Sequence, residues 1–322
     1  MRIVVTGGAG YIGSHVVRLL RERGDEVVVV DDLVTGDRRR VPGLEVVRLD
    51  LAGGDAVDAL TGALDGAEAV IHFAARKQVA ESVARPAWYY RQNIGSLAAL
   101  LEAVDAAGVG RVVFSSSAAV YGATEGAAIR ETDPTVPVNP YGDTKLVGER
   151  MLTAAVAAGG VRAVSLRYFN VAGAGWDELG DRAVLNLVPM VFERIDAGEP
   201  PVIFGDDYPT PDGTCIRDYI HVLDLAHAHI RTLDALAGGG PRHDVFNVGT
   251  GRGYSVREMI DAIAAHTGAV LPPVVRDRRP GDPAVVVADP SAIRDAIGWS
   301  AERGLDEIVA SAWSAHRSAR GA

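Results

Sequence analysis

Cysteine is almost absent from this 322-residue sequence, in which Cys215 is the only one. A single cysteine cannot form a disulfide within the chain, and it cannot build a thiolate metal cluster. No group of His, Cys, Asp and Glu recurs at metal-ligand spacing either, so we predict no metal site. A chain without disulfides suits a reducing compartment, which makes the cytoplasm the expected location.

Excess positive charge and long apolar runs are also missing. The formal net charge is -10 at pH 7, whereas nucleic acids and anionic membranes are bound by a basic field. No apolar run approaches the roughly 18 residues of a membrane span. The sequence opens on MRIVVT, without a basic segment followed by an apolar one. We therefore expect neither a nucleic acid nor a membrane as partner.

Short β-branched runs alternate with longer helical patterns in the first half of the sequence. Predicted strands cover residues 3–6, 26–30, 45–49, 69–73, 112–115 and 163–167, and helical patterns cover 13–23, 93–107 and 141–157. Such alternation is typical of a parallel sheet covered by helices. The expected fold class is α/β, with a Rossmann-like doubly wound parallel sheet.

Prolines interrupt this regular pattern after residue 167, and 322 residues exceed what one core usually holds. We therefore expect two domains. Residues 1–167 would form the sheet domain, with residues 219–249 returning to it. Residues 168–218 and 250–322 would form a smaller mixed α/β domain.

A glycine-rich turn follows the first predicted strand, with the sequence Gly7-Gly8-Ala9-Gly10-Tyr11-Ile12-Gly13. Between a strand and a helix, this spacing lets backbone N–H groups approach a pyrophosphate, although a glycine motif alone also fits an ordinary turn. Asp31 and Asp32 end the second strand, where a carboxylate binds an adenosine ribose and repels a 2′-phosphate. The pattern predicts NAD rather than NADP, with Asp50 as either an adenine contact or a turn cap.

Tyr141 and Lys145 are four residues apart in a helical stretch, so both side chains lie on one face. A free phenol has a pKa of about 10 and is a poor base at neutral pH. A neighbouring ammonium and a cationic nicotinamide ring would lower that pKa. A base at Tyr141 would take a proton from a hydroxyl oxygen of the substrate. Ser117, after the fifth strand, would hydrogen-bond that same oxygen. A solvated surface pair is the alternative, but next to a dinucleotide turn we predict that Tyr141 is a catalytic base.

Nine motifs along nearly the whole chain carry a family resemblance: TGGAGYIGSH, VIHFAA, FSSSAAVYG, PYGDTK, LRYFN, IFGDDYPTPDGT, IRDYIHVLDLA, FNVGTG and RRPGD. The sequence resembles the extended short-chain dehydrogenase/reductase family and, within it, the UDP-glucose (UDP-galactose) 4-epimerases. The resemblance implies NAD as cofactor, a UDP-sugar as substrate and a homodimer formed through paired helices. It also implies an NAD-binding sheet domain and a smaller domain that binds the nucleotide sugar.

The resemblance further implies roles for individual residues. Ser117, Tyr141 and Lys145 would be catalytic, with Lys145 also holding the nicotinamide ribose. The implied cofactor contacts are Gly7, Gly10, Tyr11, Ile12, Gly13, Asp31, Asp32, Asp50, Leu51, Phe73, Ala74, Ala75, Lys77, Asn93, Ser115, Tyr141, Lys145 and Tyr168. The implied substrate contacts are Lys77, Ser117, Tyr141, Phe169, Asn170, Asn186, Leu187, Phe204, Arg217, Arg279, Asp282 and Val286.

Two features of the implied substrate contacts bear on the ligand. Arg217 and Arg279 suit a diphosphate, since guanidinium groups match phosphate geometry. The alternative for Arg217 is an ion pair with Asp218 or Asp224. Val286 replaces a tyrosine of some family members at the wall of the sugar pocket, so N-acetylated UDP-hexoses are also expected to fit. Both UDP and thymidine diphosphate remain open as carriers.

Other reactions also begin with the oxidation of a substrate hydroxyl group by NAD. In the family, a 4,6-dehydratase carries an Asp-Glu pair where this sequence has Ala118 and Ala119, so the acid and base for dehydration are missing. A net dehydrogenase would not need a diphosphate pocket. A non-catalytic dinucleotide sensor would have no reason to keep Ser117, Tyr141 and Lys145. The favoured function is therefore epimerisation at C4′ of a UDP-hexose.

Overall fold

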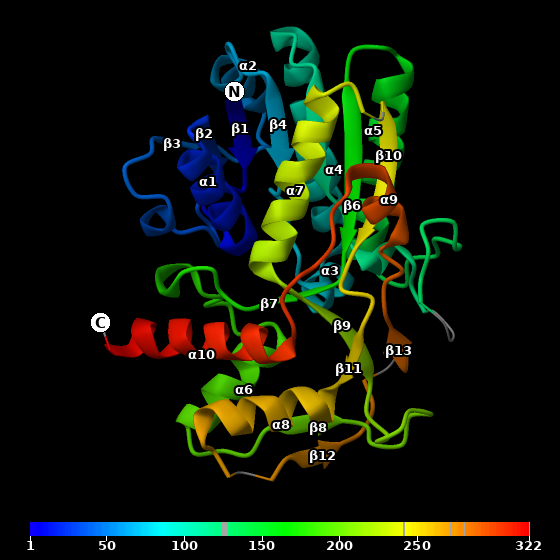
Figure 1. Ribbon diagram of the computed structural model, residues 1–322. Helices are drawn as coiled ribbons and strands as arrows, with labels where there is room; N and C mark the ends of the chain where they lie inside the picture. Colours follow the sequence, from blue (N-terminus) through cyan, green and yellow to red (C-terminus); the bar gives the residue numbers. More distant parts are fainter. Residues whose placement is uncertain (124–127, 241, 271, 280, 322) are drawn as a thin grey trace. The chain divides into compact units, whose positions relative to one another are not determined.

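The computed structural model describes residues 1–123, 128–240, 242–270, 272–279 and 281–321. Pro280 of the RRPGD motif lies outside this part of the chain. The chain forms two compact units (Figure 1). Unit 1 contains Met1–Gly122, Pro134–Tyr168 and Ala226–Phe246, and unit 2 contains Ala123–Asp133, Phe169–Leu225 and Asn247–Ala322. Each unit is therefore assembled from separate segments of the sequence.

Unit 1 is built on a seven-stranded sheet. Its strands are β1 (Arg2–Thr6), β2 (Glu26–Asp31), β3 (Val46–Arg48), β4 (Ala69–His72), β5 (Arg111–Ser115), β6 (Arg162–Tyr168) and β10 (His243–Val248). They stand in the order β10-β6-β5-β4-β1-β2-β3. Strand β1 pairs in parallel with both β2 and β4, so the strand order reverses beside β1. The predicted doubly wound sheet is confirmed, and its seventh strand, β10, comes from the segment 219–249 that was expected to return to this domain.

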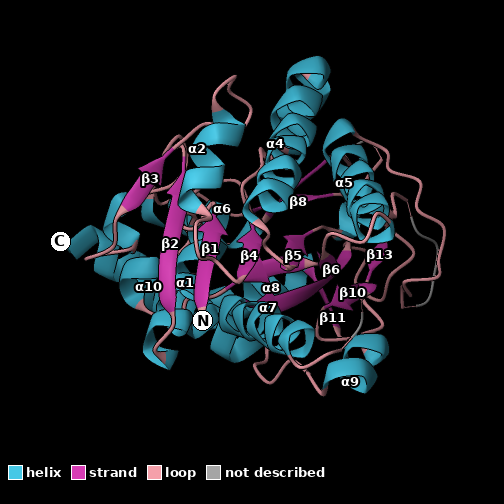
Figure 2. Cartoon of the chain, turned by 90° about the horizontal axis from the view of Figure 1, so that it is seen from above, coloured by secondary structure: helices cyan, strands magenta, loops and turns pink. Residues whose placement is uncertain are grey.

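Helices cover both faces of this sheet. Figure 2 shows α2 (Ala56–Ala63), α4 (Pro86–Ala107) and α5 (Pro140–Ala157) on one face, and α1 (Tyr11–Arg23) and α7 (Val222–Ala237) on the other. Leu60, Leu100 and Leu152 of the first group pack with Val70 and Val112 of the strands. Strands buried on both faces need continuous apolar runs, which is the pattern that the sequence shows.

Three helices begin earlier than the sequence pattern indicated. Helix α1 begins at Tyr11 rather than Gly13, and α4 begins at Pro86 rather than Asn93. Proline suits the first helical turn because it has a fixed φ and no N–H to leave unpaired. Helix α5 also begins on a proline, Pro140, and the Asn139 side chain accepts a hydrogen bond from the Gly142 N–H at 2.9 Å. Shorter helical pieces are η1 (Arg38–Arg40), α3 (Val79–Ala84) and η2 (Ala118–Val120).

Unit 2 contains a smaller mixed sheet around β9 (Ile216–His221). This strand pairs antiparallel with β11 (Gly253–Ser255) and parallel with β7 (Asn170–Ala172) and β13 (Val285–Val286). Strands β8 (Val202–Phe204) and β12 (Val274–Arg276) form a separate parallel pair. The remaining elements are η3 (Asp177–Leu179), α6 (Leu187–Asp196), α8 (Val256–Thr267), α9 (Ser291–Ile297) and α10 (Leu305–Gly321). The smaller mixed α/β part predicted from the sequence is confirmed.

Helices α6, α8 and α10 enclose the core of unit 2, where Phe192, Ile260 and Ile308 are buried together. Among the described residues, no helix combines the length and the apolar character that a bilayer span requires.

A buried aspartate anchors the loop after β10 to β9. Asp218 has 0% exposed surface, and its carboxylate accepts hydrogen bonds from the N–H groups of Thr250 and Gly251, both at 2.9 Å, and of Ala288 at 3.2 Å. Burial raises the pKa of Asp218, while these hydrogen bonds oppose the rise. The carboxylate is therefore committed to backbone groups within unit 2.

Candidate active site

The glycine turn between β1 and α1 has room for an anion but not for side chains. Gly7 has a φ of +69°, and a Cβ on it would lie 2.7 Å from the backbone nitrogen of Ala74. A Cβ on Gly13 would lie 2.3 Å from the Gly7 carbonyl oxygen. The first turn of α1 has no side-chain cap and no acidic residue. A helix start of this kind fits the pyrophosphate of a dinucleotide.

The two predicted ribose carboxylates have different surroundings in unit 1. Asp31 is 6% exposed, and it accepts hydrogen bonds from the N–H groups of Ala9 at 3.0 Å and Leu33 at 2.9 Å. Burial raises its pKa, and these bonds oppose the rise. Asp32 instead forms an ion pair with Arg76. Asp31 therefore ties β2 to the glycine turn, a positioning function that the sequence pattern did not reveal.

Other predicted cofactor contacts lie at the carboxyl ends of neighbouring strands. Phe73, Ala74 and Ala75 follow β4, and Leu51 follows Asp50 after β3. Asp50 accepts a hydrogen bond from the Ala52 N–H at 3.0 Å, which matches the turn-cap interpretation. In a parallel sheet these ends share one edge, the edge at which such folds bind ligands.

Asn93 connects this edge to the catalytic helix. Its side-chain oxygen accepts a hydrogen bond from the Arg76 N–H at 2.8 Å, and its amide donates to the Arg76 carbonyl and to Thr144, each at 3.0 Å. Thr144 lies on α5, next to Lys145. Asn93 thereby fixes the segment that leads to Lys77 against α5.

Ser117, Tyr141 and Lys145 come together at the end of β5. The Ser117 hydroxyl lies near enough to the Tyr141 phenol to lower its pKa. Lys145 is 3% exposed, and its ammonium donates to the Ser115 carbonyl at 2.8 Å. The Lys145 Nζ lies 6.0 Å from the centre of the Tyr141 ring. Of the three residues that the sequence singled out, Tyr141 and Lys145 are buried and Ser117 is half-buried.

The electrostatics of this group differ from the expectation that the ammonium lowers the phenol pKa. Burial raises the pKa of Tyr141, and only the hydrogen bond from Ser117 lowers it. Burial also lowers the pKa of Lys145 to about 7, against the effect of the Glu149 carboxylate. In a low-dielectric site the cost of losing water exceeds the attraction of one cation at this distance. The predicted role of Tyr141 as a base therefore requires the additional positive charge of the nicotinamide ring.

His229 of α7 is a neighbour that the sequence analysis missed. Its Nε2 lies 2.9 Å from the Ser115 hydroxyl, and its ring centre lies 4.6 Å from that of Phe73 and 6.3 Å from that of Tyr168. The DLAHAH stretch of α7 contains this histidine, but nothing local to that stretch points to β5. His229 therefore contacts three residues predicted to bind the cofactor, Ser115, Phe73 and Tyr168.

In unit 2, Arg217 lies beside two other predicted substrate contacts. It forms an ion pair with Asp282 at 2.5 Å, and it stands opposite Val286 in the register of β9 and β13. It does not pair with Asp218, whose carboxylate is committed to backbone groups, or with Asp224, which pairs with Arg303. Arg217 therefore does form an ion pair, but its partner is Asp282, which is itself a predicted substrate contact.

The remaining predicted contacts of unit 2 are spread over three elements. The Arg279 guanidinium lies 4.1 Å from the centre of the Phe204 ring, at the end of β8. Asn186 precedes Leu187 at the start of α6 and donates a hydrogen bond to Asp181 at 3.0 Å. Phe169 is buried, and Asn170 begins β7 as an exposed residue.

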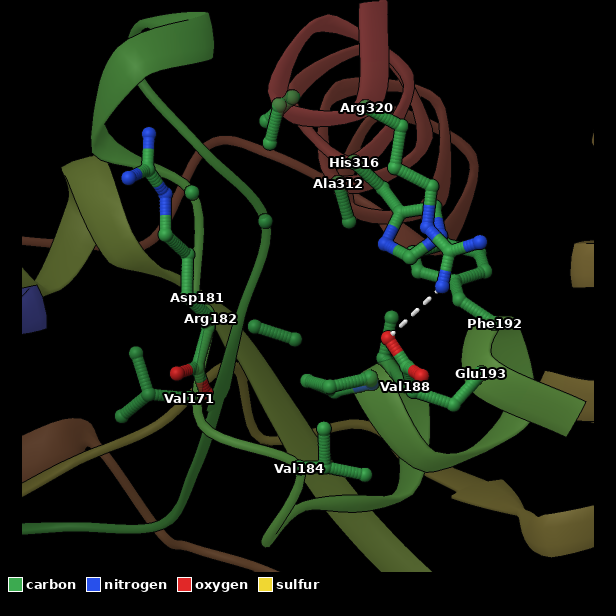
Figure 3. Close-up of a pocket in the computed structure, with 16 residues that line it drawn as sticks. Val171, Asp181, Arg182, Val184, Val188, Phe192, Glu193, Ala312, His316 and Arg320 are labelled. Carbon is green, nitrogen blue, oxygen red and sulfur yellow. Dashed lines mark hydrogen bonds and ion pairs between the residues drawn. The ribbon is translucent and has the colours of Figure 1, made fainter. Parts of the chain in front are cut away.

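A cavity in unit 2 contains none of the predicted substrate contacts among its lining residues. Figure 3 shows it lined from α6 and α10, with Arg320 paired to Glu193 beside it. Glu193, Asp196 and His316 lie close enough together to hold a metal ion. Arg320 also pairs with Asp196, at 2.9 Å, so both carboxylates already share one guanidinium. We attribute this cluster to the packing of α10 against α6.

Enzymes that combine this serine, tyrosine and lysine with a dinucleotide-binding turn form one class, the short-chain dehydrogenase/reductases. The chain belongs to the branch described as the NAD dependent epimerase/dehydratase family, whose model matches residues 3–249. Two curated relatives are UDP-glucose 4-epimerases. The one from Azospirillum brasilense is 47% identical, and the match covers 98% of this chain and 92% of the relative. The one from Streptomyces lividans is 44% identical, with 98% and 96% covered.

Solved structures give the same similarity. The UDP-glucose 4-epimerase of Stenotrophomonas maltophila, with bound NAD and formylated UDP-arabinopyranose, matches with a TM-score of 0.93 and 39% identity over 100% of both chains. The UDP-glucose 4-epimerase of Brucella ovis in complex with NAD matches with a TM-score of 0.92 and 41% identity, over 97% of both chains. The similarity therefore spans the whole chain and both units.

Proposed function

We propose that this protein interconverts UDP-glucose and UDP-galactose by NAD-dependent epimerisation at C4′. The observation that carries the proposal is the similarity, over 98% of the chain, to curated UDP-glucose 4-epimerases at 44–47% identity. The chain also lacks the acid and base of a dehydratase, because η2 presents Ala118 and Ala119 after Ser117.

The residues of unit 1 supply the proton transfer. The chemistry that bound NAD supplies is reversible hydride exchange with C4′, so the reaction has no net redox change. Tyr141 takes the proton of the 4′-hydroxyl, and Ser117 hydrogen-bonds the same oxygen. Lys145 holds the nicotinamide ribose and adds positive charge near the phenol. When the hydride returns to the opposite face, Tyr141 gives the proton back.

The residues of unit 2 bind the nucleotide sugar. Arg217 and Arg279 are the cations for its diphosphate, which carries about two negative charges. Asp282 holds the Arg217 guanidinium in place, and Phe204 supports that of Arg279. In this proposal residues 1–167 with 219–249 bind NAD, and residues 168–218 with 250–322 bind the UDP-sugar.

The direct test is to incubate the purified protein with UDP-galactose, first without and then with added NAD. We expect UDP-glucose to accumulate to equilibrium over many turnovers, with no build-up of NADH. A stoichiometric yield of NADH with an oxidised sugar would identify a net dehydrogenase instead. No sugar conversion after NAD is supplied would contradict the proposal.

N-acetylated UDP-hexoses are proposed as additional substrates. Val286 lies on β13 opposite Arg217, where a tyrosine would fill the space that an N-acetyl group needs. The wild-type protein should convert UDP-GlcNAc. Val286→Tyr should reduce that activity at least about tenfold while UDP-galactose is still converted, since pocket volume discriminates between substrates.

The matched control is Val270→Tyr, which adds the same bulk at a residue that is 92% exposed. It should leave the ratio of the two activities unchanged. Absence of UDP-GlcNAc turnover by the wild-type protein, under conditions where UDP-galactose is converted, would refute this part of the proposal.

We also propose that the protein is a cytoplasmic homodimer. The single cysteine, Cys215, supports a reducing compartment. The dimer is supported by the family resemblance, which implies association through paired helices. Helices α4 and α5 are the candidates, because they are long and pack side by side on one face of the sheet.

A further inference from the structure

A buried ion pair lies directly behind the catalytic group. Glu149 and Arg167 are 4% and 5% exposed. The Arg167 Nε donates to Glu149 Oε1 at 2.9 Å, and its Nη2 donates to Oε2 at 2.6 Å. Two-point pairing of this kind fixes the relative orientation of both side chains. The sequence analysis singled out neither residue.

Glu149 belongs to the same helix face as the catalytic residues. Tyr141, Lys145 and Glu149 follow one another at intervals of four along α5, which places them on one face. The next turn after the lysine therefore carries a carboxylate. Since Tyr141, Lys145 and Glu149 are all buried, water screens the effect of this carboxylate on the ammonium only poorly.

The same carboxylate holds the serine segment after β5. The Ser116 hydroxyl donates to Glu149 Oε1 at 2.5 Å. On one side of Ser116, the Ser115 carbonyl accepts a hydrogen bond from Lys145, and on the other side the Ser117 hydroxyl lowers the pKa of Tyr141. Arg167 also donates to the Tyr121 hydroxyl at 2.9 Å, at the end of this segment. The pair thus ties α5, the serine segment and β6 together behind the reacting groups.

Among the charged groups around Lys145, the Glu149 carboxylate is the main negative charge that acts on its ammonium. Burial lowers the pKa of Lys145 to about 7, and the Glu149 carboxylate raises it. From β4, His72 is neutral near pH 7, because burial lowers its pKa to about 3. From β6, Arg167 is held by Glu149 itself. Tyr141 is the other titratable group on this face of α5.

Groups on the remaining neighbours of α5 are paired elsewhere. From α3, Glu81 bonds to Arg85 and Tyr89. From α4, Tyr90 donates to Asp143 at 2.7 Å. From α7, His229 contacts the Ser115 hydroxyl.

We propose that Glu149 is a positioning residue for the epimerase reaction: it keeps Lys145 charged and, through Ser116 and Arg167, holds Ser117 at its working distance from Tyr141. This inference rests on the proposed function. A pair with only a stabilising role could be replaced by apolar side chains without effect on the reaction. The bonds to the serine segment and the shared helix face indicate a more specific role.

The test compares Glu149→Gln with Asp143→Asn. The second substitution removes a negative charge from the same helix, at a residue that does not share the face of Lys145 and Glu149. For Glu149→Gln, kcat should fall by about ten- to a hundredfold, as expected for small misplacement of reacting groups. Loss of the carboxylate lowers the pKa of Lys145 further, so the charged lysine is lost at a lower pH. The alkaline limb of the kcat/KM profile should therefore move down by about one pH unit. In Asp143→Asn, the alkaline limb of the kcat/KM profile should stay at its wild-type pH.

A second variant separates the two parts of the proposal. Ser116→Ala removes one hydrogen bond to Glu149 but keeps its charge, so kcat should fall while the alkaline limb stays in place. Thermal melting and bound NAD per chain confirm that each variant is folded. A fall in melting temperature for Glu149→Gln with an unmoved alkaline limb would show a purely structural role and overturn the proposal. Absence of turnover in the wild-type protein would instead refute the proposed function, since the inference uses only differences between variants.

Discussion

Tyr141→Phe is expected to lower kcat for UDP-galactose by about a thousandfold, because a positioned proton-transfer group contributes roughly 10²–10⁴-fold. The substitution removes only the phenol oxygen, whose pKa the Ser117 hydroxyl lowers. The ring is 9% exposed and keeps its packing in α5. NAD should remain bound at the wild-type level, since the glycine turn is untouched. Steady-state turnover and the NAD released on denaturation measure the two effects.

Tyr90→Phe is the matched control for this prediction. It also removes a phenol oxygen that contacts α5, where it donates to Asp143 at 2.7 Å. Its kcat should stay close to that of the wild-type protein. Near-normal turnover by Tyr141→Phe would overturn the assignment of the base. Equal losses in both variants would point to disturbed packing of α5 instead.

Gly13→Ala is expected to weaken NAD binding at least about tenfold and to lower the free energy of unfolding. The new Cβ would lie 2.3 Å from the Gly7 carbonyl oxygen and 2.9 Å from the Gly8 Cα. Both are backbone atoms, so the glycine turn must move, and overpacking of this kind costs about 1–3 kcal/mol. A shift of the turn also displaces the N–H groups at the start of α1. Calorimetric titration with NAD and thermal unfolding measure the two losses.

Gly62→Ala makes the same change in α2, where nothing lies within 4 Å of the added Cβ. This variant should bind NAD normally, and it should gain up to about 1 kcal/mol of stability because alanine restricts the unfolded chain. Wild-type NAD affinity in Gly13→Ala would show that the turn does not hold the cofactor.

Local pattern was sufficient for much of the fold. Apolar runs such as those of β1 and β4 predict strands because parallel strands are buried on both faces. The glycine turn was found because its residues are consecutive and its backbone requirement is local. The start of α4 at Pro86 was missed because the apolar pattern is weak there, although a proline at the first position is itself a helix signal.

Pairing between distant segments could not be read from the sequence. Arg217 meets Asp282 only because β13 pairs with β9, and His229 meets Ser115 only because α7 packs on the sheet of unit 1. The sign of the pKa shift of Tyr141 likewise depends on burial, which the spacing of Tyr141 and Lys145 does not reveal.

By itself, the sequence determined the class of fold, the dinucleotide-binding turn and the serine, tyrosine and lysine of the candidate site. The glycines of the turn are consecutive and Tyr141 and Lys145 are one helical turn apart, so local geometry is enough for them. The fold class follows from the alternation of strand and helix patterns, and Ser117 from its position after the fifth predicted strand. The tertiary structure alone decided which carboxylate supports which cation. Asp31 binds backbone groups of the glycine turn, and Glu149 binds Arg167 and Ser116, because strands and helices far apart in the chain bring these partners into contact where water is excluded.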